Sequence, residues 1–286
     1  MSTAPSIDDR DAQAAVDAFF DGDAPNWEAI YRRKDVFSVI HQQRQKIALD
    51  WVDTLRLSPA TRVLEIGCGA GFVSIELARR GYEVRSVDST SAMVELTRRN
   101  AKGAGVRISV AQADAHHLDS HPDGNYGLVL ALGVIPWLHS PELAVAEVSR
   151  VLGQGGHLIV NASNRGRLHH LIDPLLTPAL GPLRGAARSL LGGGKPQSQE
   201  MPAYVLHWPR QFDAMLARHH LRKMRARTFG FGPFSFWGRR LVSEGRSVRL
   251  HLKLQSLADR RIPGLRSTGA QYIVLAKKEQ PDGTRL

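Results

Sequence analysis

The sequence predicts an α/β fold in which a mostly parallel sheet is covered by helices on both faces. Short apolar runs typical of buried parallel strands alternate with amphipathic segments typical of helices. The first such run, 63–66, is followed by Gly67, Gly69 and Gly71 and then by a helical pattern over 72–80. A strand, a glycine-rich turn and a helix in this order form the phosphate- or nucleoside-binding corner of an open α/β sheet.

Length and composition indicate an ordinary globular protein. The 286 residues fit one large domain, or one domain with appendages. The single cysteine, Cys68, excludes an internal disulfide and favours a reducing, cytoplasmic compartment. We expect no signal peptide, because the N-terminus lacks a basic and then apolar pattern, and no apolar run is long enough to span a bilayer.

The net charge of +11 is unevenly distributed along the chain. Residues 1–150 hold 16 Lys and Arg against 20 Asp and Glu, whereas residues 151–286 hold 22 against 7. An excess of positive charge in one half is typical of a protein that binds nucleic acid, a membrane surface or an acidic substrate. A basic face that only keeps the protein soluble has the same composition, so both readings stay open.

The N-terminal region is predicted to be a helical extension. Residues 1–24 are polar and acidic, which indicates a frayed tail or a short helix. From Trp27 to about Leu57, apolar residues recur at three- and four-residue steps, which predicts helices. We therefore divide the chain into an N-terminal extension, 1–57, and a main domain, 58–286.

The remaining elements follow from the same patterns. Apolar runs bounded by turns predict strands, and stretches between glycine or proline signals predict helices. The strands are expected at 82–87, 106–111, 126–131, 157–160, 222–231 and 271–276, and the helices at 141–152, 208–220 and 246–261.

A long segment, about 161–204, interrupts this alternation. It is rich in Gly, Pro, Leu and Arg, and we interpret it as a helical insertion that covers a pocket. A basic, leucine-rich element can also lie on an anionic membrane. The insertion therefore predicts either a lid shielded from solvent or a peripheral membrane contact.

The glycine turn carries a more specific pattern. Glu-x-Gly-x-Gly-x-Gly, from Glu65 to Gly71, resembles motif I of the class I S-adenosylmethionine-dependent methyltransferases. The dinucleotide fingerprint is less well matched, because Phe72 stands where it requires a small residue. The resemblance implies a Rossmann-like, doubly wound sheet of seven mostly parallel strands with an antiparallel last strand. It also implies that the extension over 1–57 forms a lid.

The resemblance implies S-adenosyl-L-methionine as the cofactor and assigns its contacts. The glycine turn would wrap the methionine part, and Glu65 would hold the ammonium group. Asp88 ends the second strand about 20 residues after the glycines, where an acid accepts hydrogen bonds from both ribose hydroxyls. Met93 would pack near the adenine, and Asp114 would accept from its amino group. The full set is Glu65, Gly67, Cys68, Gly69, Gly71, Asp88, Ser89, Met93, Asp114, Ala115, Ala131 and Leu132.

Catalytic and substrate-binding residues are harder to select. Methylation of a hydroxyl requires a nearby general base, for which His41, His116 and His139 are candidates. Tyr31, Trp137 and His207 are candidate substrate contacts, and His207 is a further candidate base. A lone histidine or aromatic residue is more often structural, so each assignment competes with simple packing. No metal-ligand spacing is present, so no metal is expected.

The favoured function is O-methylation of a small or lipid-like molecule by a cytoplasmic enzyme. Ala-Leu-Gly-Val, residues 131–134, stands at the end of the strand predicted at 126–131. Enzymes that methylate DNA adenine or glutamine carry Asn- or Asp-Pro-Pro-Tyr at this place, which argues against both activities. Two alternatives remain: an RNA or protein methyltransferase that uses the basic half, and a cofactor-binding protein without catalysis. Peripheral contact with an anionic membrane and the oligomeric state stay open.

Overall fold

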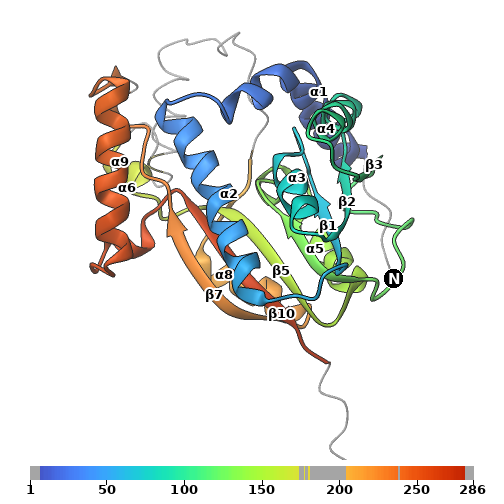
Figure 1. The fold of residues 1–286 in the computed structure, drawn as a ribbon. Helices are drawn as coiled ribbons and strands as arrows, with labels where there is room; N and C mark the ends of the chain where they lie inside the picture. The colour runs from blue at the N-terminus through green and yellow to red at the C-terminus, as the bar shows by residue number, and fades with distance from the viewer. Residues whose placement is uncertain (1–6, 174–176, 178–179, 181–203, 238, 281–286) are drawn as a thin grey trace, which may run out of the picture.

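One mixed sheet forms the centre of the fold in the computed structural model, which describes residues 7–173, 177, 180, 204–237 and 239–280 (Figure 1). Seven strands follow the order β3-β2-β1-β4-β5-β10-β7, and a short strand, β6, adds to β5. Neighbouring strands are parallel except for β10, which is antiparallel to β5 and β7. The strands are β1 (Arg62–Ile66), β2 (Glu83–Asp88), β3 (Ser109–Gln112), β4 (Tyr126–Ala131), β5 (Leu152–Asn164), β6 (Leu206–His207), β7 (Leu221–Phe229) and β10 (Gln271–Lys278).

This arrangement confirms the predicted fold class. A small antiparallel hairpin, β8 (Ser235–Phe236) with β9 (Arg239–Arg240), lies outside the main sheet. The helices are α1 (Ile7–Ile30), α2 (Val36–Leu55), α3 (Phe72–Arg79), α4 (Ser91–Gly103), α5 (Pro141–Val151), α6 (Leu168–Ile172), α8 (Pro209–Arg218) and α9 (Glu244–Asp259), with short 3-10 turns η1 (Ile135–Trp137) and η3 (Leu265–Ser267).

Two hydrophobic clusters explain why the central strands are apolar along both faces. One cluster joins the sheet to α5 and α8, and includes Val148 and Phe212. The other joins the opposite face to α2 and α3, and includes Trp51 and Leu77 (Figure 1). A strand covered on both sides has no solvent-facing row, so its apolar residues do not alternate with polar ones.

The N-terminal region differs from the prediction. A frayed tail or short helix over 1–24 is wrong, because α1 is a 24-residue helix from Ile7 to Ile30. Acidic residues are scattered along its sequence, and the helix is stabilised by packing against α4 and by burial of Val16 and Ala24. The chain then leaves the helical path over 31–35, and Asp35 caps α2 by accepting the Ser38 backbone N–H at 2.9 Å.

Several boundaries in the second half also differ. The strand predicted at 157–160 runs from Leu152 to Asn164, because its glycine-rich start still pairs with β4. The strand predicted at 106–111 is shorter and begins at Ser109. Of the insertion predicted over about 161–204, the first residues continue β5 and α6 is a short helix. Most of its remainder lies outside the described residues, so the helical insertion stays a prediction.

Candidate active site

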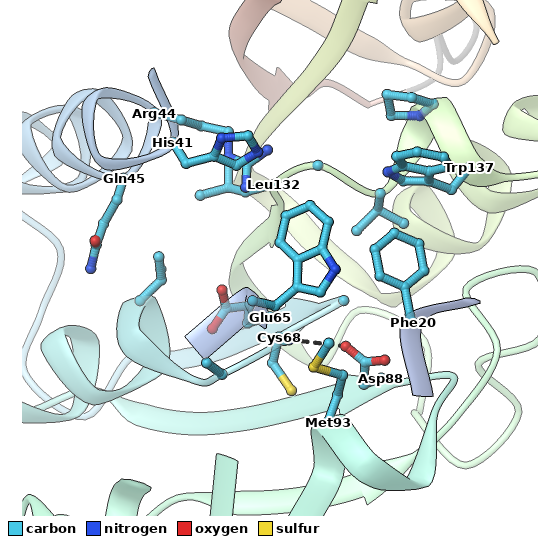
Figure 2. A pocket seen from close by; sticks show the side chains of 18 of the residues that line it. Phe20, His41, Arg44, Gln45, Glu65, Cys68, Asp88, Met93, Leu132 and Trp137 are labelled. Atoms are coloured by element: carbon cyan, nitrogen blue, oxygen red, sulfur yellow. Dashed lines mark hydrogen bonds between the residues drawn. The ribbon is translucent and has the colours of Figure 1, made fainter. Parts of the chain in front are cut away.

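The carboxyl ends of β1, β2 and β4 meet at one edge of the sheet, beneath α1 and α2. A cavity of about 300 Å³ lies there, lined by the glycine turn, by the ends of these strands and by side chains of both N-terminal helices (Figure 2). Open α/β sheets bind ligands at this edge, where neighbouring strands feed connections to opposite faces. The cavity is therefore the candidate active site.

The glycine turn presents bare backbone to this cavity. Gly67 and Gly69 have φ angles of +66° and +54°, a region that residues with a Cβ adopt at a cost. A Cβ on Gly67 would lie 2.3 Å from a methyl of Val134, whereas a Cβ on Gly69 would meet no atom within 4 Å. The side of Gly69 that faces the cavity is therefore free for close approach by a ligand.

Asp88 is fixed beside this turn. Its carboxylate accepts the Gly69 backbone N–H at 2.9 Å and, through its other oxygen, the Thr90 N–H and hydroxyl at 3.2 and 3.1 Å. The side chain lines the cavity although the residue is only 8% exposed, and burial raises its pKa. The carboxylate oxygen that accepts only the Gly69 N–H keeps acceptor capacity for a hydroxyl of a ligand.

A second acid and a cation lie at the other end of the turn. Glu65, 3% exposed, accepts a hydrogen bond from the Ser74 hydroxyl, and burial raises its pKa to about 8. Arg44 of α2 also lines the cavity, and its guanidinium lies so close to Gly133 that a Cβ there would be 2.5 Å from Nη1. A buried carboxyl group and a guanidinium therefore face this end of the cavity (Figure 2).

Helix α1 closes the cavity from above. Asp17 accepts the Ser89 hydroxyl at 2.8 Å, and Asp21 accepts the Ala92 backbone N–H at 3.0 Å, in the first turn of α4. Phe20 packs against Trp137 with ring centroids 5.2 Å apart. Two hydrogen bonds and an aromatic contact thus hold the helix over the turn. Sequence reasoning missed this contribution, because 1–24 carries no helical periodicity strong enough to indicate it.

The structure brings together eleven of the predicted site residues and separates seven from the cavity. The lining includes Tyr31, His41, Glu65, Gly67, Cys68, Gly69, Asp88, Ser89, Met93, Leu132 and Trp137. The residues that do not line it are Gly71, Ala131, Asp114, Ala115, His116, His139 and His207. Among the residues that line the cavity, sequence reasoning missed Arg44, since a single arginine inside a predicted helix carries no motif.

The candidate histidines occupy three different environments. The Nδ1–H of His41 donates to the Phe37 carbonyl at 2.9 Å, and burial and the charge of Arg44 lower its pKa to about 3. His116 is buried outside the cavity, where its Nδ1 lies 2.6 Å from Asp114 and its ring stacks on His139. This contact orients Asp114 and lowers the pKa of its carboxyl, despite partial burial.

His207 lies in β6, and its ring contacts Phe212 of the core. Burial lowers its pKa. No group of three or more His, Cys, Asp or Glu residues suited to a metal ion occurs among the described residues.

Residues 64–160 match the family model of a methyltransferase domain. The matched range contains the glycine turn, both acids and the end of β4. These residues therefore form a methyltransferase domain. Outside this range, the fold of the chain is also similar to that of solved proteins with this domain.

The methyltransferase domain has relatives among characterised sequences. A ubiquinone biosynthesis O-methyltransferase of Alkalilimnicola ehrlichii is 27% identical over 170 residues, which cover 59% of this chain and 64% of that protein. The enzyme of the same name from Pseudomonas aeruginosa is 25% identical over 148 residues, 52% of this chain and 62% of that protein. The matches thus span less than two thirds of these relatives.

Solved structures extend the fold similarity to nearly the whole chain. Magnesium protoporphyrin IX methyltransferase from Synechocystis, with bound SAH, has a TM-score of 0.62 at 16% identity and covers 94% of this chain and 100% of its own. The [4+2]-cyclase SpnF has a TM-score of 0.60, also at 16% identity, and covers 98% and 99%. At these identities the likeness concerns the fold alone. None of the described helices combines the length and apolar character needed to cross a membrane.

Proposed function

We propose that this chain is an S-adenosylmethionine-dependent methyltransferase that transfers a methyl group to an oxygen of a small or lipid-like molecule. The observation that carries the proposal is the convergence of the glycine turn, Glu65 and Asp88 on one cavity enclosed by aromatic side chains. The relatives named as ubiquinone biosynthesis O-methyltransferases support oxygen as the accepting atom.

The residues at the cavity fit the chemistry of this cofactor. The open side of Gly69 admits a close ligand, and Asp88 offers a fixed acceptor for the ribose hydroxyls. Glu65, once ionised, and Arg44 complement the ammonium and carboxylate of an amino-acid group. We assign these four residues to the ribose and methionine parts.

The residues for the adenine part of the cofactor are assigned partly from outside the cavity lining. Met93 and Ser89 line the cavity beside Asp88, and Met93 is suited to pack on a flat ring. Asp114 and Ala115 keep their proposed adenine contacts, although they lie outside the present lining. His116 acts there as a positioning residue, because its imidazole holds the Asp114 carboxylate.

When bound, the cofactor supplies a methyl group on a sulfonium, which is already a good leaving group. Transfer of this methyl group to an acceptor hydroxyl would break the S–CH₃ bond and form an O–CH₃ bond, and the hydroxyl proton would pass to a base of the protein or to water. His41 offers a neutral ring for that proton or for orientation, but with a pKa of about 3 it is a weak base. The protein's main contribution is therefore alignment of the reactants and exclusion of water by Phe20, Trp27 and Trp137.

We also propose that the enzyme contacts an anionic membrane surface. Phe236 and Trp237 of the β8-β9 hairpin are 43% and 62% exposed, and Leu241 and Leu252 lie exposed on the following segment and on α9. Exposed arginines accompany them, namely Arg239, Arg240, Arg246 and Arg249. Aromatic and leucine side chains with basic neighbours suit the interface of an anionic bilayer. Co-sedimentation with phosphatidylglycerol vesicles, but not with phosphatidylcholine vesicles, is expected.

The experiment that tests the function is transfer of labelled methyl groups from the cofactor into a lysate. The products are separated into lipid, small-molecule, RNA and protein fractions. Asp88→Ala serves as the variant with weakened cofactor binding, and Glu95→Gln as the matched surface control. Label in the lipid or small-molecule fraction is expected. Label confined to RNA or protein would support the alternative methyltransferase, and SAH binding without any transfer would indicate a protein that has lost catalysis.

A further inference from the structure

We propose that the acceptor is a planar aromatic molecule that carries a carboxylate, and that Arg167 binds this carboxylate. The inference rests on the proposed function and names the class of substrate for the same cavity. Arg167 lies between the end of β5 and the start of α6, and its side chain lines the cavity.

The guanidinium of Arg167 is held in place by two neighbours. Its Nε donates to Nε2 of His170 at 2.8 Å, and one of its terminal nitrogens donates to the Tyr204 hydroxyl. Burial, followed by the charge of Arg167, lowers the pKa of His170 to about 4, so this imidazole is neutral and can accept. The guanidinium also lies over the Tyr204 ring, 5.4 Å from its centroid. Its orientation is therefore set before any ligand arrives.

Its positive charge is not neutralised by the described part of the protein. Arg167 takes part in none of the ion pairs among the described residues. The acids that line the cavity are Glu65 and Asp88, which the proposed function assigns to the cofactor. A guanidinium offers five N–H donors, of which these neighbours use two. The remaining donors suit a planar, two-oxygen anion.

An aromatic wall leads from this cation toward the cofactor end of the cavity. Tyr204 lies 5.8 Å from Trp137, and Trp137 lies 5.2 Å from Phe20, measured between ring centroids. Tyr204 is fixed to the same wall, because the backbone N–H of Val205 donates to the Pro136 carbonyl at 2.7 Å. Flat rings stack on such surfaces, so the wall and the guanidinium together select an aromatic acid.

The other cation that lines the cavity is accounted for separately. Arg44 lies beside Glu65, and its charge lowers the pKa of that carboxyl. It therefore belongs to the charged pair assigned to the amino-acid end of the cofactor. Arg167 is left as the cationic contact for the acceptor among the described residues of the lining.

The test compares aromatic ligands that differ in the carboxylate: salicylate with phenol, protocatechuate with catechol, and hydroxynaphthoate with naphthol. Binding is measured by calorimetry on the full chain saturated with SAH. We expect at least one acid to bind about 10-fold more tightly than its neutral partner, as a charged hydrogen bond allows. Arg167→Gln should remove this preference without changing the affinity for the neutral partner, and Arg167→Lys should retain part of it.

The controls separate this inference from the proposed function. Arg210→Gln, an exposed arginine of α8, should keep the wild-type preference. SAH affinity and thermal unfolding report whether each variant folds and binds cofactor. A wild type that binds no SAH contradicts the proposed function alone, since the ligand pairs can then be compared on the protein without SAH. The inference is overturned if no acid outbinds its partner, or if the preference survives in Arg167→Gln.

Discussion

Cofactor affinity should depend on pH through Glu65. Burial raises the pKa of this carboxyl to about 8 in the free protein, so at neutral pH it is mostly protonated. Its proposed partner is an ammonium group, which binds the ionised carboxylate. Binding below pH 8 must therefore release a proton, and the cost of that ionisation reduces the affinity.

The magnitude follows from the distance between the working pH and the pKa. At pH 6, two units below a pKa of about 8, ionising Glu65 costs about 3 kcal/mol. SAH affinity should therefore rise about 100-fold from pH 6 to pH 8 and level off above it. Calorimetry at pH 6, 7 and 8 in buffers of different ionisation enthalpy measures both the affinity and the number of protons released.

Two variants isolate this effect from other groups that titrate. Glu65→Gln should bind SAH more weakly at pH 8 and lose the part of the pH dependence that Glu65 supplies, whereas Glu95→Gln, on the exposed face of α4, should keep the wild-type slope. A wild-type affinity that stays flat from pH 6 to pH 8, or a slope unchanged in Glu65→Gln, would refute the reasoning.

Further predictions concern contacts around the same cavity. Asp88→Ala should weaken SAH binding by about 1–3 kcal/mol in calorimetry, the usual cost of losing a charged hydrogen-bond partner, and unchanged affinity would count against the ribose contact. Gly67→Ala should lower the melting temperature strongly, because the new Cβ would lie 2.3 Å from Val134 at a φ of +66°. Gly22→Ala is the control inside α1: its Cβ meets open space, so this variant should stabilise the protein by about 0.5–1 kcal/mol. Asp21→Ala should speed SAH dissociation about 2- to 10-fold in stopped-flow measurements, because one hydrogen bond between α1 and α4 is lost; an unchanged rate would show that α1 does not limit release.

The pH dependence of stability gives a separate check on Glu65. A folded-state pKa raised from about 4.5 to about 8 contributes stability that is complete below pH 4.5 and is lost as the pH rises through 8. The difference in unfolding free energy between wild type and Glu65→Gln, measured by urea titration without cofactor, should therefore move against the wild type by several kcal/mol, about 3–5, from pH 5 to pH 8. A difference that does not change with pH would contradict a buried, protonated Glu65.

The strands and the glycine turn could be predicted from the sequence because their signals are local. β4 is an unbroken apolar run since helices cover both of its faces, and the spacing from Gly67 to Asp88 is set by one helix and one strand. For these elements the sequence therefore indicated both the motif and its position in the fold. The boundaries of β5 were missed, because pairing with two neighbours extends a strand beyond its apolar core.

The enclosing part of the site could not be predicted in the same way. Arg44, Phe20 and Arg167 come from three segments that only tertiary packing brings to one cavity. Helix α1 carries acidic residues scattered along its length, so its position depends on contacts such as Asp17 with Ser89 rather than on a continuous apolar face. The histidines show the reverse case, since His116 was selected for chemistry and lies in a structural contact with Asp114.

The position of α1 has a consequence for the order of events in catalysis. Gln13, Val16 and Phe20 of α1 line one side of the cavity. If this helix has to detach and return for the cofactor and its spent form to pass, the frequency of that movement, rather than the methyl transfer itself, would set the maximum rate. Anything that binds the detached helix would thereby slow the enzyme without touching its reactants.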